Sequence, residues 1–143
     1  MSTAYQTDVI AWANEQVALL RSGNLSAIDI EHIAEEIEDV GKSEQRELAN
    51  RMAVLLAHLL KWAHQPERRG ASWRLTIKAQ RKEVGYNIIE SPSLKAKLNE
   101  VAWLDMVWAK AVAQAAEETG LDTLPEVCPW TVEQRLSQVV VPD

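Results

Sequence analysis

The stretch from Ser43 to Pro66 constrains the fold more than any other part of the chain, because its apolar residues recur with the period of an α-helix. At 100° per residue one face of this helix is apolar, as expected where a helix packs on a core. That face holds Leu48, Met52, Leu55, Leu56, Leu59 and Ala63. A second line is polar and holds Glu47, Arg51, His58, Lys61 and Gln65. The pattern predicts a long amphipathic helix with a polar seam.

Further helices are predicted on both sides of this stretch. They are expected over residues 8–22, 26–40, 72–90 and 93–120, with a short last helix after Thr131. Gly23, Gly41 and Gly120 are natural helix stops. Capping boxes are predicted at Ser26 with Asp29 and at Thr131 with Gln134, and single caps at Ser43, Ser72 and Ser93.

No segment alternates with the period of two that strands require, so the sequence predicts an all-α protein. Short connections favour an up-and-down helical bundle of about five helices plus a short C-terminal helix. A chain of 143 residues buries enough surface to fold as one domain, so residues 1–143 are predicted to form a single helical domain.

Gly41 and Lys42 alone separate two predicted helices, which indicates an antiparallel hairpin. The earlier helix would then bury Ile30, Ile33, Ala34, Ile37 and Val40. In this hairpin Asp29 would lie near His58 and Glu36 near Arg51. A carboxylate beside an imidazole can orient a general base, so the candidate catalytic residues are His58, Arg51, Asp29 and Glu36. The alternative is a structural pairing at a helix interface.

Charge is unevenly distributed although the net charge is −6. Residues 26–47 carry eight acidic and two basic side chains, whereas residues 61–82 carry seven basic side chains and one acidic. Either the two segments shield each other or the basic one is a surface for phosphate groups, with Trp73 available for stacking. The candidate binding residues are Lys61, Gln65, Arg68, Arg69, Trp73, Arg74, Lys78 and Arg81.

Several classes of protein are not expected. Cys128 is the single cysteine, which excludes an internal disulfide and suits a reducing cytosol. Metal sites in helical bundles use paired Glu-x-x-His motifs, which this chain lacks, so no metal or cofactor is predicted. The chain has no apolar run of about 20 residues and no secretory signal, so a cytoplasmic protein without a membrane anchor is expected.

Arg51 and His58 form an Arg-x6-His pair that loosely resembles the motif of the HEPN ribonucleases. In such a site Arg holds the RNA phosphate while His exchanges a proton. Met52 stands where that group commonly has a polar residue. A HEPN-like ribonuclease, or another metal- or phosphate-dependent enzyme using Arg51 and His58, is therefore the enzyme alternative.

Five runs resemble, in order and spacing, a bacterial family catalogued as domain of unknown function 29. They are LSAIDIEHIAEEIEDVGKSEQREL, LLAHLLKWAHQPERRGASWRLTIKAQR, SPSL, EETGL and LPEVCPW. The resemblance implies a helical fold and a cytoplasmic bacterial protein, and it brings no established activity. The matching positions include Asp29, Glu35, Glu36, His58, Lys61, Trp62, Gln65, Pro66, Ser72 and Trp73.

The chain has six Trp residues and no Phe. Trp is a frequent anchor of protein interfaces. The function predicted from the sequence is therefore a protein-binding or regulatory module of unknown activity. Its expected partner is another protein or a second copy of itself, ahead of nucleic acid.

Overall fold

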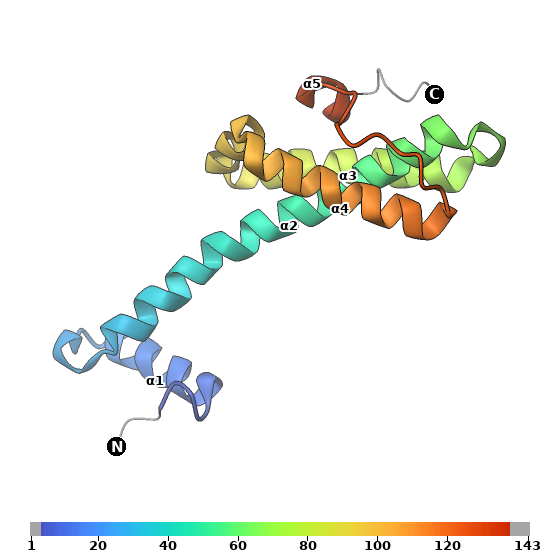
Figure 1. Ribbon diagram of the computed structural model, residues 1–143. Helices are drawn as coiled ribbons and strands as arrows, with labels where there is room; N and C mark the ends of the chain where they lie inside the picture. The colour runs from blue at the N-terminus through green and yellow to red at the C-terminus, as the bar shows by residue number, and fades with distance from the viewer. Residues whose placement is uncertain (1–3, 138–143) are drawn as a thin grey trace. The chain divides into compact units, whose positions relative to one another are not determined.

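The computed structural model describes residues 4–137 of the chain (Figure 1). Its helices are α1 (Val9–Arg21), α2 (Ile30–His64), α3 (Ala71–Glu90), α4 (Val101–Thr119) and α5 (Val132–Leu136). Three 3₁₀ segments join them, η1 (Leu25–Ala27), η2 (Pro66–Arg68) and η3 (Pro92–Asn99). Residues 4–137 contain no strand, so the prediction of an all-α bundle is confirmed. Over the same residues, no helix combines the length and the apolar character that crossing a membrane requires.

The chain divides into two compact units, Met1–Ser43 and Glu44–Asp143. The first unit contains α1, η1 and the beginning of α2. The second contains the rest of α2 and all later elements. The sequence-based assignment of one domain stays a prediction.

The predicted hairpin at Gly41 is wrong, because α2 is one uninterrupted helix of 35 residues that passes through Gly41, Lys42 and Ser43 (Figure 1). Positive φ angles occur among the described residues only at Gly23 and Gly120, so Gly41 keeps ordinary helical geometry. A glycine inside a helix costs about 1 kcal/mol relative to Ala. That cost is small beside the burial of the apolar face that follows, so Gly41 does not stop the helix and Ser43 does not cap one.

The other helix ends test the remaining helix stops and caps that the sequence predicts. Gly23 and Gly120 adopt the left-handed conformation, each with φ of 75°, and the Thr131–Gln134 capping box is present. At the start of α2, however, Asp29 accepts the backbone N–H of His32 at 3.3 Å, so Asp29 replaces the capping box predicted from Ser26.

The caps predicted at Ser72 and Ser93 are also wrong. Helix α3 follows Gly70, which lies one residue before its first helical position. Segment η3 covers Ser93, and α4 begins only after Glu100.

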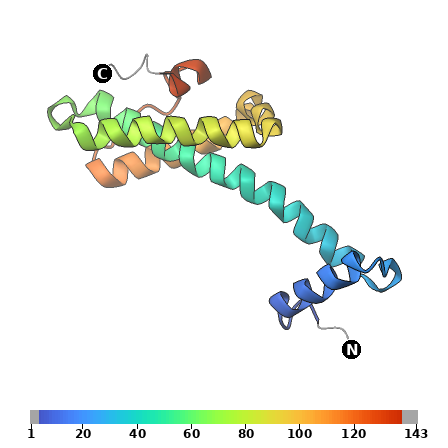
Figure 2. The same cartoon turned by 180° about the vertical axis from the view of Figure 1, so that it is seen from behind.

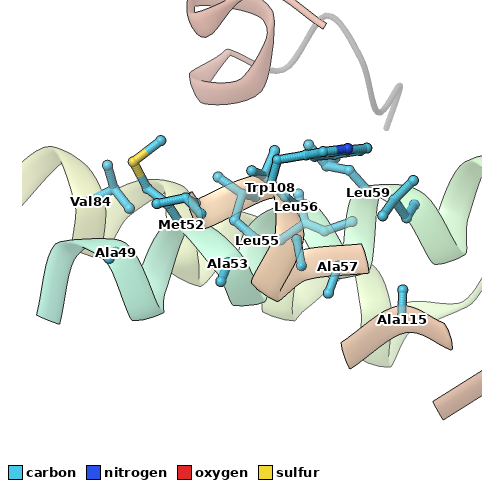
Figure 3. Packing of buried hydrophobic residues seen from close by; sticks show 14 of the residues in the cluster. Ala49, Met52, Ala53, Leu55, Leu56, Ala57, Leu59, Val84, Trp108 and Ala115 are labelled. Carbon is cyan, nitrogen blue, oxygen red and sulfur yellow. The ribbon is translucent and has the colours of Figure 1, made fainter. Parts of the chain in front are cut away.

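The core of the second unit is built on the apolar face of α2. Figures 1 and 2 show α3 and α4 alongside the part of α2 that belongs to this unit. Figure 3 shows Met52, Leu56 and Leu59 of α2 packed beside Trp108 of α4, and Val84 of α3 lies in the same cluster. The predicted stripe is therefore confirmed, except that its last member, Ala63, is exposed.

The first unit has a much smaller interior. Trp12 is its one buried apolar side chain among residues 4–43. The Trp12 ring packs edge-on against Tyr5, with centroids 4.8 Å apart, and its Nε1 donates to Asp29 at 3.0 Å. The predicted burial of Ile30, Ala34, Ile37 and Val40 is wrong, since Ala34 is exposed and the three larger side chains are 65–70% exposed. Their expected partner was the second arm of a hairpin that does not form.

Candidate functional site

Two of the four candidate catalytic residues hold the first unit together. Asp29 Oδ2 accepts from Trp12 Nε1 and, at 2.7 Å, from His32 Nδ1, and the bond from His32 is the main cause that lowers the pKa of Asp29. Glu36 accepts from the Tyr5 hydroxyl, which raises the pKa of Tyr5 to about 12. Both carboxylates are thus used inside the first unit. Their predicted pairing with residues of a second hairpin arm is wrong, because that pairing required the chain to turn at Gly41.

Arg51 and His58 lie seven residues apart on α2. Arg51 Nη2 lies 2.8 Å from Glu47 Oε1, and Arg51 Nη1 lies 3.5 Å from Glu83 Oε2 on α3. The half-buried His58 has its Nδ1 2.9 Å from the Val54 carbonyl oxygen, which it reaches as a donor. Arg51 is therefore held by two carboxylates. Within the described part of the chain, no three His, Cys, Asp or Glu side chains are grouped to hold a metal ion.

His58 gives the second unit a predicted pH dependence. Burial lowers the pKa of His58, and the positive charge of Lys61 acts in the same direction. The unfolded chain therefore binds a proton more readily than the folded chain as the pH falls below the ordinary His value of about 6.5, so stability falls. We expect the wild type to lose more unfolding free energy between pH 7.5 and 5 than His58→Gln, measured by urea titration. Equal losses of unfolding free energy in the wild type and in His58→Gln would contradict the predicted role of His58.

Two candidate binding residues near the α2–α3 connection, Lys61 and Arg69, contact aromatic rings and polar groups of the second unit. Buried Lys61 pairs with Glu118 of α4, and its ammonium lies 5.9 Å from the Trp73 ring centre. Arg69 Nε donates to the Trp62 carbonyl at 2.7 Å, and its guanidinium lies 5.3 Å from the Trp62 ring. These contacts stabilise the turn between the helices.

The predicted basic strip on α3 divides into two parts. Arg74 and Lys78 are exposed, and Arg74 also lies 5.6 Å from the Trp62 ring. Arg81 instead turns toward α5, where its Nε donates to the Arg135 carbonyl oxygen at 3.2 Å. No pattern in the sequence points to Arg135, because its contact with Arg81 depends on where α5 packs. The exposed face of α3 also includes Lys82, which sequence reasoning left out of the strip.

Two other candidates complete this region. Arg68 is exposed in η2, whereas Gln65 is buried and its Oε1 has no hydrogen-bond partner. The Arg68 backbone N–H donates to the Gln65 carbonyl oxygen at 3.0 Å, which is a contact of the main chain and not of the two side chains. The structure therefore does not assemble the candidate binding residues into one site.

Helix α4 carries a surface pocket that sequence reasoning did not identify. Its volume is about 450 Å³, and it is lined by Asp105, Trp108, Ala109, Val112, Ala113, Glu126 and Val127. Trp108 Nε1 donates to the Pro125 carbonyl at 3.1 Å, which holds the segment after α4 against the helix. The pocket combines an apolar wall with two acidic residues.

The largest group of exposed apolar side chains lies on the first unit. Its members are Val9, Ile10, Val17, Leu20, Leu25, Ile30, Ile37 and Val40, all at least 43% exposed. On α2, Ile30, Ala34, Ile37, Val40 and Gly41 form what we call the α2 arc. At 100° per residue the arc spans about 120° and contains no charged residue. Glu31 and Glu38 follow one of its edges.

Comparison with known proteins identifies a family. The model of the family described as "Domain of unknown function DUF29" matches residues 4–140, which include parts of both units. No curated protein and no solved structure matches the chain.

Proposed function

The chain belongs to the DUF29 family, whose description assigns no function, and we propose that it is a protein-interaction module whose partner is a second copy of itself. The observation that carries this proposal is the exposed α2 arc. Its apolar residues are spaced as in a helix that packs against another helix.

The small interior of the first unit supports the proposal. Segments of about 40 residues rarely bury enough apolar surface to be stable without disulfides, metals or association. The first unit buries Trp12 and exposes eight large apolar side chains. Exposed apolar patches of this kind commonly mark protein interaction sites.

The sequence spacing within the arc suits a helix as its partner. Ile30, Ile37 and Val40 of the arc recur at intervals of three and four when the half-buried Ile33 on the same side of α2 is included. This is the spacing by which two helices interlock their side chains. Ala34 and Gly41 are small and exposed, and nothing lies within 4 Å of a Cβ placed on Gly41. A second helix can therefore approach the arc closely.

The exposed face of α3 complements the arc in both polarity and charge. This α3 face presents Leu75, Tyr86 and Ile89, which are 58–72% exposed, together with Lys78 and Lys82. The first unit carries eight acidic and two basic residues over residues 4–43, a net charge of −6. Two arcs facing each other would bring like charges together, whereas an arc on the α3 face pairs opposite charges.

The proposed dimer is therefore reciprocal. In it the arc of each copy binds the α3 face of the other, so the same pair of surfaces is used twice. Glu31 and Glu38 then lie next to Lys78 and Lys82 of the second copy. None of these four side chains has an ion-pair partner within residues 4–137.

A charge-swap experiment tests this arrangement by measuring mass in solution with light scattering. We expect the wild type to be a dimer, and we expect Glu31→Lys/Glu38→Lys and Lys78→Glu/Lys82→Glu each to weaken dimerisation by about tenfold or more. Mixing the two variants should restore dimers, because both interfaces of the mixed pair again join opposite charges. Glu117→Lys/Asp122→Lys, which reverses exposed acids elsewhere, is the matched control and should remain dimeric.

Two results would overturn the proposal. One is a wild type that stays monomeric over a concentration series, which would point to a different partner carrying basic and apolar residues. The other is a pair of variants that does not recover dimers on mixing although each is folded by circular dichroism.

The enzyme alternative has less support. The Arg51 guanidinium is already paired with the carboxylates of Glu47 and Glu83. The two carboxylates predicted to assist catalysis, Asp29 and Glu36, accept hydrogen bonds inside the first unit instead. A regulatory role and a cytoplasmic location stay predictions.

A further inference from the structure

Two arginines meet where α5 packs against α3. Arg135 of α5 is 8% exposed, and Arg81 of α3 is partly buried. The Arg81 side chain is linked to the Arg135 main chain, because Arg81 Nε donates to the Arg135 carbonyl oxygen at 3.2 Å. Arg135 Nε in turn donates to the Trp130 carbonyl at 3.0 Å. Both guanidinium groups are thus held in place through their Nε atoms.

One outer nitrogen of each group lacks a partner. Arg81 Nη2 and Arg135 Nη1 are buried from solvent and make no hydrogen bond. Buried donors in folded proteins are nearly always satisfied, and an unmet donor on a charged group is especially unfavourable. Two such donors on neighbouring arginines therefore indicate that an acceptor normally lies between or beside them.

Among the residues that the structure describes, no acidic side chain supplies that acceptor. Within residues 4–137 neither arginine forms an ion pair, and the nearest acid along α3, Glu83, pairs with Arg51. Guanidinium groups stay protonated at any physiological pH, so the two positive charges persist. Burial lowers the pKa of Arg81.

We propose that Arg81 and Arg135 form a binding site for a small oxyanion, of which inorganic phosphate is the simplest example. A planar guanidinium presents parallel N–H donors that match two oxygens of a phosphate or a carboxylate. The fixed Nε atoms leave the Nη atoms to contact the anion. The site is independent of the α2 arc and of the exposed α3 face, so the dimer proposal can fail without affecting it.

Titration with inorganic phosphate tests the site, with chloride adjusted to keep the ionic strength constant. Isothermal titration calorimetry should show saturable binding at one site per chain, and phosphate should raise the thermal unfolding midpoint. Arg81→Met and Arg135→Met should each bind at least tenfold more weakly. Arg46→Met removes an exposed arginine outside the predicted binding residues and should bind phosphate as the wild type does. A second titration with acetate shows whether the site binds phosphates, carboxylates or both. Saturable binding of either anion supports the site.

The proposal is overturned if neither phosphate nor acetate binds saturably, or if both Met variants bind as tightly as the wild type. Arg81→Lys provides a second route if a Met variant does not fold. It keeps the positive charge and removes the planar fork, and it should still lose about tenfold in affinity. Wild-type affinity in a folded Arg81→Lys would also overturn the proposal.

Discussion

Leu56→Ala is expected to lower the free energy of unfolding by about 2–5 kcal/mol. Leu56 has no exposed surface and lies in the cluster where α2 packs beside Trp108 of α4 (Figure 3). Removing its three outer carbons loses their burial and leaves a cavity among neighbours that are already close-packed. The effect is measured by urea unfolding followed by circular dichroism.

Leu25→Ala is the matched control for this change. Leu25 lies in η1 and is 62% exposed, so the same truncation creates no cavity and should change the unfolding free energy by about 0.5 kcal/mol or less. If Leu56→Ala were no more destabilising than Leu25→Ala, Leu56 would not lie in the core of the second unit.

Gly41→Pro and Gly41→Ala are expected to have opposite effects. Proline inside a helix removes a backbone hydrogen bond and collides with the preceding turn, which costs about 3 kcal/mol or more. Alanine at the same position should stabilise the protein by about 0.5–1 kcal/mol, because Gly41 is helical, has no positive φ and has space for a Cβ.

This pair of variants distinguishes one continuous helix from a hairpin. If the chain turned at Gly41, alanine would be the damaging change, since a left-handed turn favours glycine. Helix content by circular dichroism and the unfolding midpoint should both fall for proline and rise slightly for alanine. A lower midpoint for Gly41→Ala would show that α2 is interrupted there. Gly120→Ala, at a position with φ of 75°, should lower the unfolding midpoint as expected of a true helix stop.

Features that depend on neighbouring residues were predictable from the sequence. The stripe from Leu48 to Leu59 forms because its period is a property of the segment itself. The Thr131–Gln134 capping box forms because both of its hydrogen bonds lie within one turn. Gly120 ends α4 because its left-handed conformation is strained for other residues.

Features that depend on distant packing were not predictable. A glycine followed by a polar residue occurs both at helix ends and inside exposed helices, and the local sequence does not distinguish the two. Gly41 lies inside a helix. Because the chain does not turn at Gly41, Asp29 and Glu36 do not pair with His58 and Arg51 as predicted. Arg81 has the spacing of a surface residue, and only the position of α5 explains why it is partly buried against Arg135.

The continuity of α2 has a consequence for the proposed binding of its arc to a second copy. Starting a helix is unfavourable, whereas extending an existing one is nearly neutral for each residue. The buried stretch from Leu48 to Trp62 is fixed by the core, so the residues of the arc join a helix that already exists. The arc is therefore preorganised. Its conformational entropy is lost when the chain folds, and little more is lost when a partner arrives.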